Sequence, residues 1–489
     1  MKARNNPRRV GLTFDDVLLV PKYSEIASRK SVGTGTNFSR RIKLSIPIVS
    51  ANMDTVTESS MAIALAREGG IGVIHRFMSV DEEAAEVEKV KRSEGVIIEN
   101  PITMTPEKSV REARALLDER DVGGIVVVGR DGRVQGILTR RDIALEDDQD
   151  MKVSRAMTPR KDLVTAHPGV SMDRAKRTLH EHRIEKLPLL DGKGRLVGLI
   201  TSKDILKRRQ YPAATKDDKG RLRVAAAVGV KGDVITRAGR LLEAGADALV
   251  VDIAHGHSAN AISTLKRIKK EFKDAEVVAG NVATAAGAHD LIRAGADSVK
   301  VGVGSGSICI TRLVSGFGVA QLTAIMDSAG PAEDEGVPII GDGGIRNPGD
   351  VTKAIAAGAS TVMVGSLFAG TEESPGPTIL RDGVRYKLTR GMASFAATLG
   401  RSMREEGRPS VTEAVEDALE GAVPEGVEGL IPYKGNVSEV VRQLVGGLRS
   451  GMSYCGAKSL AGLRRNAEFM IVTEAGRRES GPHDIEKVV

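Results

Sequence analysis

The chain has 489 residues, of which 41% are hydrophobic and 28% charged, as expected for a globular protein with more than one domain. Only two cysteines occur and no apolar run is long enough to span a membrane, so we expect a cytoplasmic protein without a disulfide framework or membrane segment. The formal net charge is +7 but aromatic residues make up only 3%, which favours phosphorylated small molecules over a specific nucleic-acid partner.

Residues 1–94 begin a parallel α/β domain. An apolar run at 12–24 is followed by two buried-strand patterns, PIVS from Pro47 and IGVIH from Ile71. Between them, SSMAIALAREGG predicts a helix that ends at Gly69 and Gly70. A strand–helix–strand unit of this kind is typical of a parallel sheet.

Residues 95–211 contain two copies of one pattern and predict a separate α+β domain. Each copy starts with MTP, continues through an amphipathic helix and two strands joined by a glycine-containing turn, and closes on T-x-x-D at the start of a helix. A repeat of this length is one supersecondary unit, so the two copies should share a core. The closing pairs are Thr139 with Asp142 and Thr201 with Asp204. The polar stretch 211–221 predicts a linker back to the first domain.

Residues 212–489 resume the alternation of strands and helices. Six apolar strands are predicted, with the sequences RVAAAVGV, ALVVDIAHG, EVVAGNVAT, SVKVGVG, VPIIGDGG and STVMVGS. Together with the two strands before the insertion they number eight, which predicts a (β/α)₈ barrel, with a doubly wound open sheet as the alternative.

Polar residues and glycines mark the carboxyl ends of these strands, where barrel enzymes place their chemistry. The residues are Asp252, Asn281, Gly302 and Asp342. GDGGI at 341–345 and VGS at 364–366 end strands seven and eight, where barrels commonly bind phosphate through backbone N–H groups. Each Asp could instead cap a helix.

The stretch SVKVGVGSGSICITR, residues 298–312, is the best candidate for the reactive centre. Its glycines let the backbone approach a ligand closely, and Cys309 follows directly, where a thiolate nucleophile would be placed. A buried, inert thiol in a tight turn is the alternative for a lone cysteine.

Across nearly the whole chain these motifs resemble the inosine-5′-monophosphate (IMP) dehydrogenases of the IMP dehydrogenase and GMP reductase family. The motifs are SANMDTV, VDIAHGHS, GNVAT, KVGVGSGSICITR, GDGGIR, VGSLFAGTEESPG, RGMAS, VPEGVEG and PYKG. The inserted repeat is similar to a cystathionine-β-synthase (CBS, or Bateman) pair. The resemblance implies a barrel with an inserted CBS pair that oxidises IMP to XMP with NAD⁺.

The resemblance also implies roles for individual residues. Cys309 attacks the purine C2, Thr311 orients the hydrolytic water, and Glu425 lies near that water. Substrate-binding positions are Ser50, Ser307, Asp342, Gly343, Gly344, Gly365, Ser366, Gly391 and Met392. Cofactor-binding positions are Asp252, Asn281, Gly302 and Gly304. Carbonyls of Gly304, Gly306 and Cys309 would hold K⁺. The T-x-x-D residues would bind purine nucleotides or merely cap helices, and the assembly would be a homotetramer, with an octamer left open.

Two positions depart from the family pattern. Thr389 stands before RGM, where the family usually has Tyr, and the flap at about 393–430 lacks the Arg-Tyr pair whose Arg is the general base for hydrolysis. Arg404 is nearest in register, with Arg401 and Arg408 as competitors. The altered flap leaves two alternatives open, namely an NADPH-dependent GMP reductase and a nucleotide-sensing paralogue with weakened catalysis.

Overall fold

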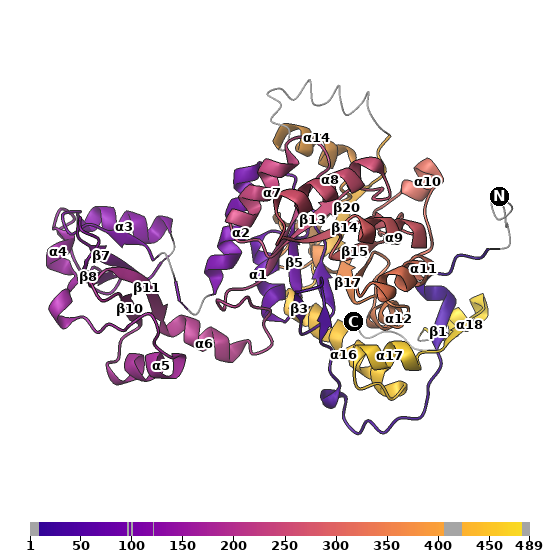
Figure 1. The fold of residues 1–489 in the computed structure, drawn as a ribbon, viewed down its shortest axis with the longest axis horizontal. Helices are drawn as coiled ribbons and strands as arrows, with labels where there is room; N and C mark the ends of the chain where they lie inside the picture. Colours follow the sequence, from indigo (N-terminus) through magenta and orange to yellow (C-terminus); the bar gives the residue numbers. More distant parts are fainter. Residues whose placement is uncertain (1–8, 95–96, 99–100, 121, 405–422, 482–489) are drawn as a thin grey trace. The chain divides into compact units, whose positions relative to one another are not determined.

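The computed structural model describes residues 9–94, 97–98, 101–120, 122–404 and 423–481. The chain forms two compact units (Figure 1). The first comprises residues up to 93, residues 213–217 and residues from 222 onward, and the second comprises 94–212 and 218–221. No helix in these described ranges is long and apolar enough to cross a membrane.

The first unit is built on a closed barrel of eight parallel strands. These are β4 (Ile48–Ser50), β5 (Ile71–Ile74), β12 (Val224–Val228), β13 (Ala248–Asp252), β14 (Glu276–Val282), β15 (Ser298–Val301), β16 (Ile339–Asp342) and β17 (Thr361–Val364). Their order is β12-β13-β14-β15-β16-β17-β4-β5, and β5 pairs with β12 to close the ring. All eight predicted strands are present. The barrel prediction is confirmed and the open-sheet alternative is wrong.

The helices of this unit lie around the barrel, and most of them pack on its outer surface (Figure 1). They are α1 (Ser59–Arg67), α2 (Val80–Ser93), α7 (Val234–Glu243), α8 (Ala259–Glu271), α9 (Ala285–Arg293), α10 (Thr311–Ser315), α11 (Gln321–Asp334), α12 (Pro348–Ala356), α13 (Ser366–Ala369), α14 (Phe395–Arg404), α16 (Val437–Tyr454), α17 (Leu460–Asn466) and α18 (Glu474–Glu479). The strands are buried on both faces, and β12 is buried at all five residues. This double burial explains their continuous apolar sequences.

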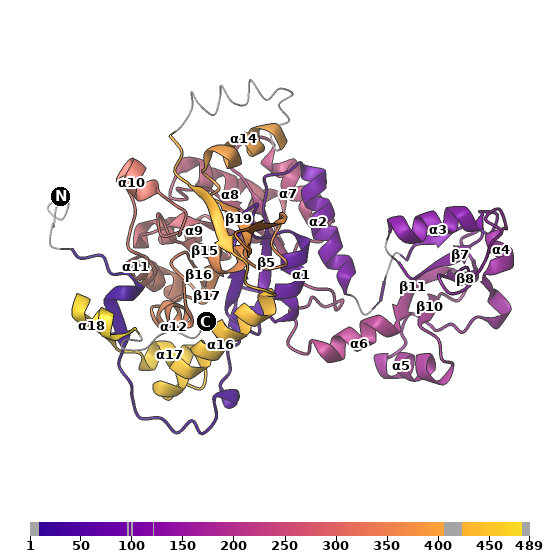
Figure 2. The same ribbon diagram turned by 180° about the vertical axis from the view of Figure 1, so that it is seen from behind.

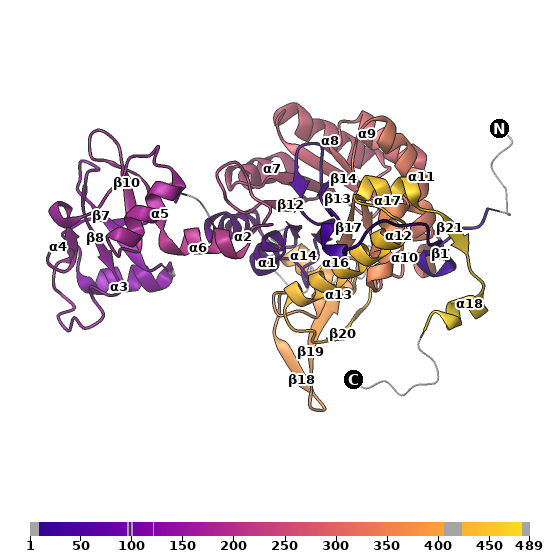
Figure 3. The same ribbon diagram turned by 90° about the horizontal axis from the view of Figure 1, so that it is seen from below.

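Smaller sheets surround the barrel. Near the two ends of the chain, η1 (Phe14–Asp16) leads into β1 (Val17–Leu19), which pairs with β21 (Phe469–Ile471). A three-stranded sheet of β18 (Thr378–Arg381), β19 (Val384–Arg390) and β20 (Glu428–Pro432) carries the RGM motif beside the barrel (Figures 2 and 3). The remaining short elements are η2 (Arg29–Ser31), β2 (Thr36–Asn37) and β3 (Lys43–Leu44).

The second unit contains the two copies of the repeat. Its elements are β6 (Thr103–Met104), α3 (Val110–Glu119), β7 (Gly124–Val128), β8 (Val134–Thr139), α4 (Val153–Ala156), β9 (Thr158–Pro159), η3 (Arg160–Asp162), α5 (Met172–Glu181), β10 (Lys186–Leu190), β11 (Leu196–Thr201) and α6 (Ser202–Gln210). The copies share a core, because Val126 and Val134 of the first pack with Leu190 and Leu199 of the second.

One local expectation for the repeat is wrong. The first T-x-x-D, at Thr139, was expected to open a helix, but turns follow β8 there. Arg114 of α3 donates to the carbonyls of Ile143 and Glu146, which a continuing helix would need for its own hydrogen bonds. The second copy does open a helix, α6, directly after Thr201.

Candidate active site

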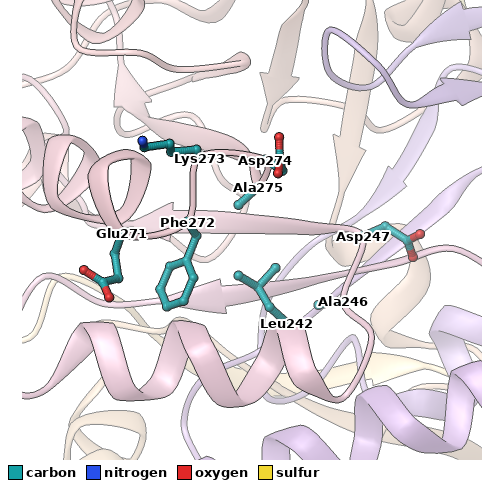
Figure 4. A pocket seen from close by; sticks show the side chains of 8 residues that line it. All are labelled: Leu242, Ala246, Asp247, Glu271, Phe272, Lys273, Asp274 and Ala275. Atoms are coloured by element: carbon teal, nitrogen blue, oxygen red, sulfur yellow. The ribbon is translucent and has the colours of Figure 1, made fainter.

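The predicted site residues gather at the carboxyl ends of the barrel strands. Asp252 and Asp342 are the last residues of β13 and β16, and Asn281 is the penultimate residue of β14. A surface depression lined by Leu242 and Phe272 lies instead at the amino ends of β13 and β14 (Figure 4). Barrel enzymes use the carboxyl face, so this depression is not the candidate site.

Cys309 lies on the loop that follows β15 and is half-buried. Its Sγ is 3.1 Å from Oγ1 of Thr311, and its backbone N–H donates to the carbonyl of Gly306 at 3.2 Å. The thiol and the hydroxyl predicted to orient water therefore share one turn of the chain. Glu425 is also close in the backbone, since its carbonyl accepts from the N–H of Ile310 at 2.8 Å.

Three segments that lie far apart in the sequence pack closely against Cys309, and a glycine is required where their backbones meet. The N–H of Val427 donates to the carbonyl of Ile308 at 3.0 Å, and the N–H of Gly391 donates to the carbonyl of Val427 at 3.0 Å. A Cβ on Gly391 would lie 3.0 Å from the Cα of Gly426 and 3.1 Å from the carbonyl oxygen of Ile308. The cysteine loop, the RGM motif and the PEG motif are thus held together by backbone contacts. Met392 follows Gly391 and is half-buried.

The GDGG loop packs tightly against its neighbours. Gly343 and Gly344 have φ of +101° and +80°, values that favour glycine. A Cβ on Gly343 would lie 2.4 Å from Oγ of Ser305 in the cysteine loop, and one on Gly344 would lie 3.1 Å from the buried ring of Phe14. The loop is therefore fixed between the cysteine loop and the N-terminal segment.

Arg346, at the end of GDGGIR, supports this loop from outside. Its guanidinium binds Asp15 through both terminal nitrogens, at 2.7 and 2.5 Å, and its Nε lies 3.3 Å from Asp350. The hydrogen bond from Arg346 is the main reason that the pKa of Asp15 lies below its ordinary value. All three nitrogens of the Arg346 guanidinium therefore bind carboxylates of the protein.

The remaining substrate-site predictions fall at two other strand ends and on the cysteine loop. Ser50 ends β4 and is fully buried, and its Oγ accepts from Oγ1 of Thr57 at 2.8 Å. Gly365 and Ser366 begin α13 and are half-buried, while Ser307 is exposed. Ser307 and the start of α13 are therefore more accessible than Ser50, which is fully buried.

A buried lysine that the sequence analysis missed connects the predicted ligand residues. Nζ of Lys300 lies 3.1 Å from Oδ1 of Asp252 and 3.0 Å from Oδ2 of Asp342, and it also contacts Oδ1 of Asn281. The Nδ2 of Asn281 donates at 2.8 Å to both Oδ2 of Asp342 and the carbonyl of Gly302. The sequence feature that could have revealed it is a lysine within the predicted buried strand SVKV, because a buried charge needs a partner.

Charge explains the protonation states of this group. Burial alone would lower the pKa of Lys300, but the carboxylates of Asp342 and Asp252 outweigh it and raise that pKa. Burial likewise favours a neutral Asp252, yet the cations of Lys300 and Arg76 bring its pKa below the ordinary value. Lys300 is therefore an ammonium and Asp252 a carboxylate at neutral pH.

The loop that carries Gly304 and Gly306 offers backbone carbonyl oxygens as ligands. Gly304 has φ of +76°, and the carbonyl of Gly306 accepts the N–H of Cys309. Backbone carbonyls are hard donors of the type that a monovalent cation requires, so the donor set fits K⁺. Arg312 packs against Gly304, where a Cβ would lie 2.6 Å from its Cγ.

The residue that precedes the RGM glycine fastens the chain to the barrel just before the flap begins. Arg390, before Gly391, donates through Nε to Oδ2 of the buried Asp54 at 2.7 Å, an ion pair that sequence reasoning missed. Helix α14 runs to Arg404, but the side chain of Arg404 lies outside the described part, as do Arg408 and the rest of 405–422. The predicted general base is not located by this structure.

In the second unit, Asp142 closes the turn that follows β8. Its Oδ2 accepts from the backbone N–H of Thr139 at 2.7 Å and from Oγ1 of the same residue at 2.8 Å. The residue is exposed, and both of these hydrogen bonds are made by one of its two carboxylate oxygens. Thr201 ends β11, and the side chain of Asp204 lies outside the described part.

Comparison with known proteins agrees with this geometry. The sequence profile of the "IMP dehydrogenase / GMP reductase domain" matches residues 11–483. The inosine-5′-monophosphate dehydrogenase of Nitrosopumilus maritimus is 57% identical over 475 residues, which cover 97% of this chain and 98% of that protein. The enzyme of the same name from Aquifex aeolicus is 52% identical, with coverage of 97% and 96%.

Solved structures of similar length and fold are GMP reductases from Trypanosoma brucei. A variant in complex with guanosine 5′-monophosphate has a TM-score of 0.92 and 46% identity, covering 98% of both chains. A complex with guanosine 5′-triphosphate has a TM-score of 0.80 and 42% identity, covering 95% of this chain and 98% of that one. Since these reductases match along the full length, length does not separate the two activities.

Proposed function

The chain belongs to the IMP dehydrogenase and GMP reductase family, and we propose that it oxidises IMP to XMP with NAD⁺ in guanine nucleotide biosynthesis. The observation that carries the proposal is the pair Cys309 and Thr311, with Sγ 3.1 Å from Oγ1, at the end of β15 beside the PEG motif. The dehydrogenase assignment within the family rests on relatives of that name at 50–57% identity.

The residues of the site supply the steps of a covalent mechanism. The Cys309 thiolate adds to C2 of the purine, and the hydrogen at C2 leaves with its electron pair as hydride, giving a thioimidate on Cys309. NAD⁺ supplies the acceptor for that hydride. A water held near Thr311 then adds to C2, loses a proton to a base, and expels the cysteine thiolate to give XMP. Glu425 and a flap arginine, Arg404, are the groups that we propose for handling this proton.

We propose that the strand-end loops bind the nucleotide around Cys309. Asp342 would accept hydrogen bonds from the ribose hydroxyls, because its carboxylate ends β16 beside the GDGG loop. Gly391 and Met392 would contact the base from the RGM motif. The phosphate would be bound by N–H groups and hydroxyls of Ser50, Ser307, Gly343, Gly344, Gly365 and Ser366. The tight packing of Gly343 against Ser305 supports a preformed loop.

We propose that the cofactor lies on the other side of the cysteine loop. Asp252 and Asn281 would contact the nicotinamide ribose, with the backbone of Gly302 and Gly304 close by. A K⁺ ion would be held by carbonyls of Gly304, Gly306 and Cys309, whose oxygen donors suit it. Bound there, the ion would stabilise the conformation of the cysteine loop.

We propose that the second unit is a CBS pair that binds purine nucleotides. The shared core of the two copies and the outward-facing Asp142 support this, and a related reductase carries guanosine 5′-triphosphate. We also propose a homotetramer, with an octamer as the alternative, located in the cytoplasm. Exposed apolar side chains beside the cysteine loop, Leu313 and Phe317 at 85% and 77% exposure, support association.

GMP reductase is the second candidate, because the flap departs from the dehydrogenase pattern and solved reductases share the fold along the full length. One assay distinguishes the two. The protein is incubated either with IMP and NAD⁺ or with GMP and NADPH, the nicotinamide absorbance is followed, and the purine product is identified. We expect XMP and NADH from the first pair. Formation of IMP and ammonia from the second pair alone would overturn the dehydrogenase assignment.

A further inference from the structure

Lys300 is a buried cation that contacts residues proposed for two different ligands. It is the third residue of β15, and its side chain is 3% exposed. Its Nζ lies 3.1 Å from Asp252, proposed for the cofactor ribose, and 3.0 Å from Asp342, proposed for the substrate ribose. One ammonium therefore stands between the two sites.

Asn281 completes the connection. An ammonium only donates and a carboxylate only accepts, so the amide must turn Oδ1 to Lys300 and Nδ2 to Asp342, as observed. The same Nδ2 reaches the carbonyl of Gly302 on the cysteine loop at 2.8 Å. A shift of the ammonium would thus move the amide, both carboxylates and the start of that loop.

The two carboxylates differ in their partners. Asp252 has Arg76 as a second nearby cation besides Lys300, whereas Oδ2 of Asp342 accepts from Lys300 and Asn281. Among the described residues no group donates to Oδ1 of Asp342, which leaves that oxygen for a ligand hydroxyl. Hydroxyls that donate to Asp342 would share in stabilising its charge and so weaken its hold on the ammonium.

We infer that Lys300 is a positioning residue that couples the substrate and cofactor sites, so that each ligand strengthens binding of the other. This inference rests on the proposed assignment of Asp342 and Asp252 to the two riboses. When substrate hydroxyls donate to Asp342, the ammonium is held mainly by Asp252 and Asn281, and these two residues are then fixed for the cofactor. By thermodynamic linkage the cofactor must favour the substrate by the same factor.

The test measures that factor by calorimetry in a Cys309→Ala background, where binding proceeds without chemistry. The dissociation constant of NAD⁺ is measured with and without saturating IMP. We expect IMP to tighten NAD⁺ binding by a factor in the range of about 5 to 150 that is usual for coupled sites. Adding Lys300→Met should bring the factor close to one, and Lys300→Arg, which keeps the charge, should restore part of it.

A matched control separates coupling from loss of a buried charge. Lys91 is 4% exposed, and its Nζ contacts two carboxylates, Asp217 at 3.1 Å and Asp247 at 2.6 Å. Asp247 lies at the amino end of β13, opposite the candidate site. Lys91→Met should lower the melting temperature but leave the coupling factor unchanged.

A second variant keeps the test decisive if Lys300→Met does not fold. Asp252→Asn leaves the ammonium to Asp342, so it should weaken IMP binding without NAD⁺ by about threefold or more, as expected for interacting neighbours. Any of three results would overturn the inference. These are a coupling factor near one in the parent, a coupling factor in Lys300→Met within twofold of the parent value, and an IMP affinity that is unchanged in Asp252→Asn.

Failure of the proposed function would look different. If the protein converts GMP with NADPH but not IMP with NAD⁺, the dehydrogenase proposal fails. The Lys300 inference is then tested with GMP and NADPH in the same variants. Coupling that depends on Lys300 with that ligand pair would support the inference independently of the reaction.

Discussion

The thiol of Cys309 lies 3.1 Å from the hydroxyl of Thr311. Thr311 is the first residue of the short helix α10, and Cys309 precedes it by two residues. Both groups are held in place from outside the loop, because the carbonyl of Glu425 accepts the N–H of the intervening Ile310. The nucleophile and the group proposed for orienting water thus depend on contact with the PEG motif, more than a hundred residues further along the chain.

Removal of the thiol should stop the reaction but not binding. Cys309→Ala is expected to abolish turnover of IMP while calorimetry still detects IMP binding, because all the proposed phosphate and ribose contacts except Ser307 lie on other loops. Cys455→Ala is the control. Cys455 is buried at the C-terminal end of α16, and burial raises the pKa of its thiol, so it should be dispensable for catalysis. A Cys309→Ala protein that retains most of its kcat would refute the nucleophile assignment.

The ion pair of Asp15 with Arg346 should stabilise the protein in a pH-dependent way. The pKa of Asp15 is lowered in the folded state, so its contribution is complete above the unfolded value of 3.8 and is lost as the pH falls below that value. Asp15→Asn should lower the melting temperature at pH 7 by the equivalent of about 1 kcal/mol or less, and the difference should shrink at pH 3.

The same variant should also raise KM for IMP, because Arg346 supports the GDGG loop. Asp150→Asn removes an exposed ion pair with Arg111 in the second unit and serves as the control. It should change neither KM nor the pH dependence of stability. A melting-temperature difference for Asp15→Asn that stays constant between pH 7 and pH 3 would contradict the expected role.

The barrel was predictable because its strands carry the signal in their own sequences. Apolar runs such as VAAAV at β12 and ALVVD at β13 are buried on both faces, and the residue that ends each run marks the catalytic face. Lys300 was overlooked because a charge inside such a run has no partner in the local sequence. Its three acceptors lie on three other strands and meet it only after the barrel closes.

Other contacts were beyond sequence reasoning for a similar reason. The turn after β8 replaces an expected helix because Arg114, from the preceding helix α3, takes the carbonyls of Ile143 and Glu146. The ion pair of Arg390 with Asp54 joins residues 336 positions apart. Spacing along the chain gives no information on either contact.

The inserted unit should be removable. The segment 213–217 stays with the barrel, because Thr215 donates its N–H to the carbonyl of Ala66 at 2.8 Å, so a deletion of 95–211 should retain it. Since each unit has its own core, the shortened protein should fold and keep most of its kcat, while effects of purine nucleotides on activity should disappear.

Steady-state kinetics with and without added GTP or ATP, combined with circular dichroism, would test this deletion. Full-length Asp142→Ala is the matched control, which should keep the fold and the activity but weaken the nucleotide response. A deletion protein that folds but has lost its chemistry would show that the second unit contributes to the active site.

The flap offers the sharpest test of the hydrolysis step. Hydride transfer precedes hydrolysis and does not need the base, so Arg404→Ala should keep a stoichiometric burst of NADH. Its steady-state turnover should fall by about 10²- to 10⁴-fold, the usual effect of losing a general base. A guanidinium has an ordinary pKa above about 12, so it can act as a base only in a site that favours its neutral form. One stopped-flow trace gives both the burst amplitude and the steady-state rate.

Comparison of neighbouring arginines decides how the flap result is read. If Arg404→Ala turns over normally while Arg401→Ala or Arg408→Ala stalls after the burst, the base is a different arginine and the mechanism stands. If none of the three stalls, another group activates the water. Thr311 and Glu425 are then tested next, since the carbonyl of Glu425 accepts the N–H of Ile310, the residue before Thr311. A further outcome is that IMP gives no burst even in the unmodified protein, while GMP and NADPH give IMP and ammonia. The protein is then a reductase, which has no hydrolysis step, and this explains why its flap departs from the dehydrogenase pattern.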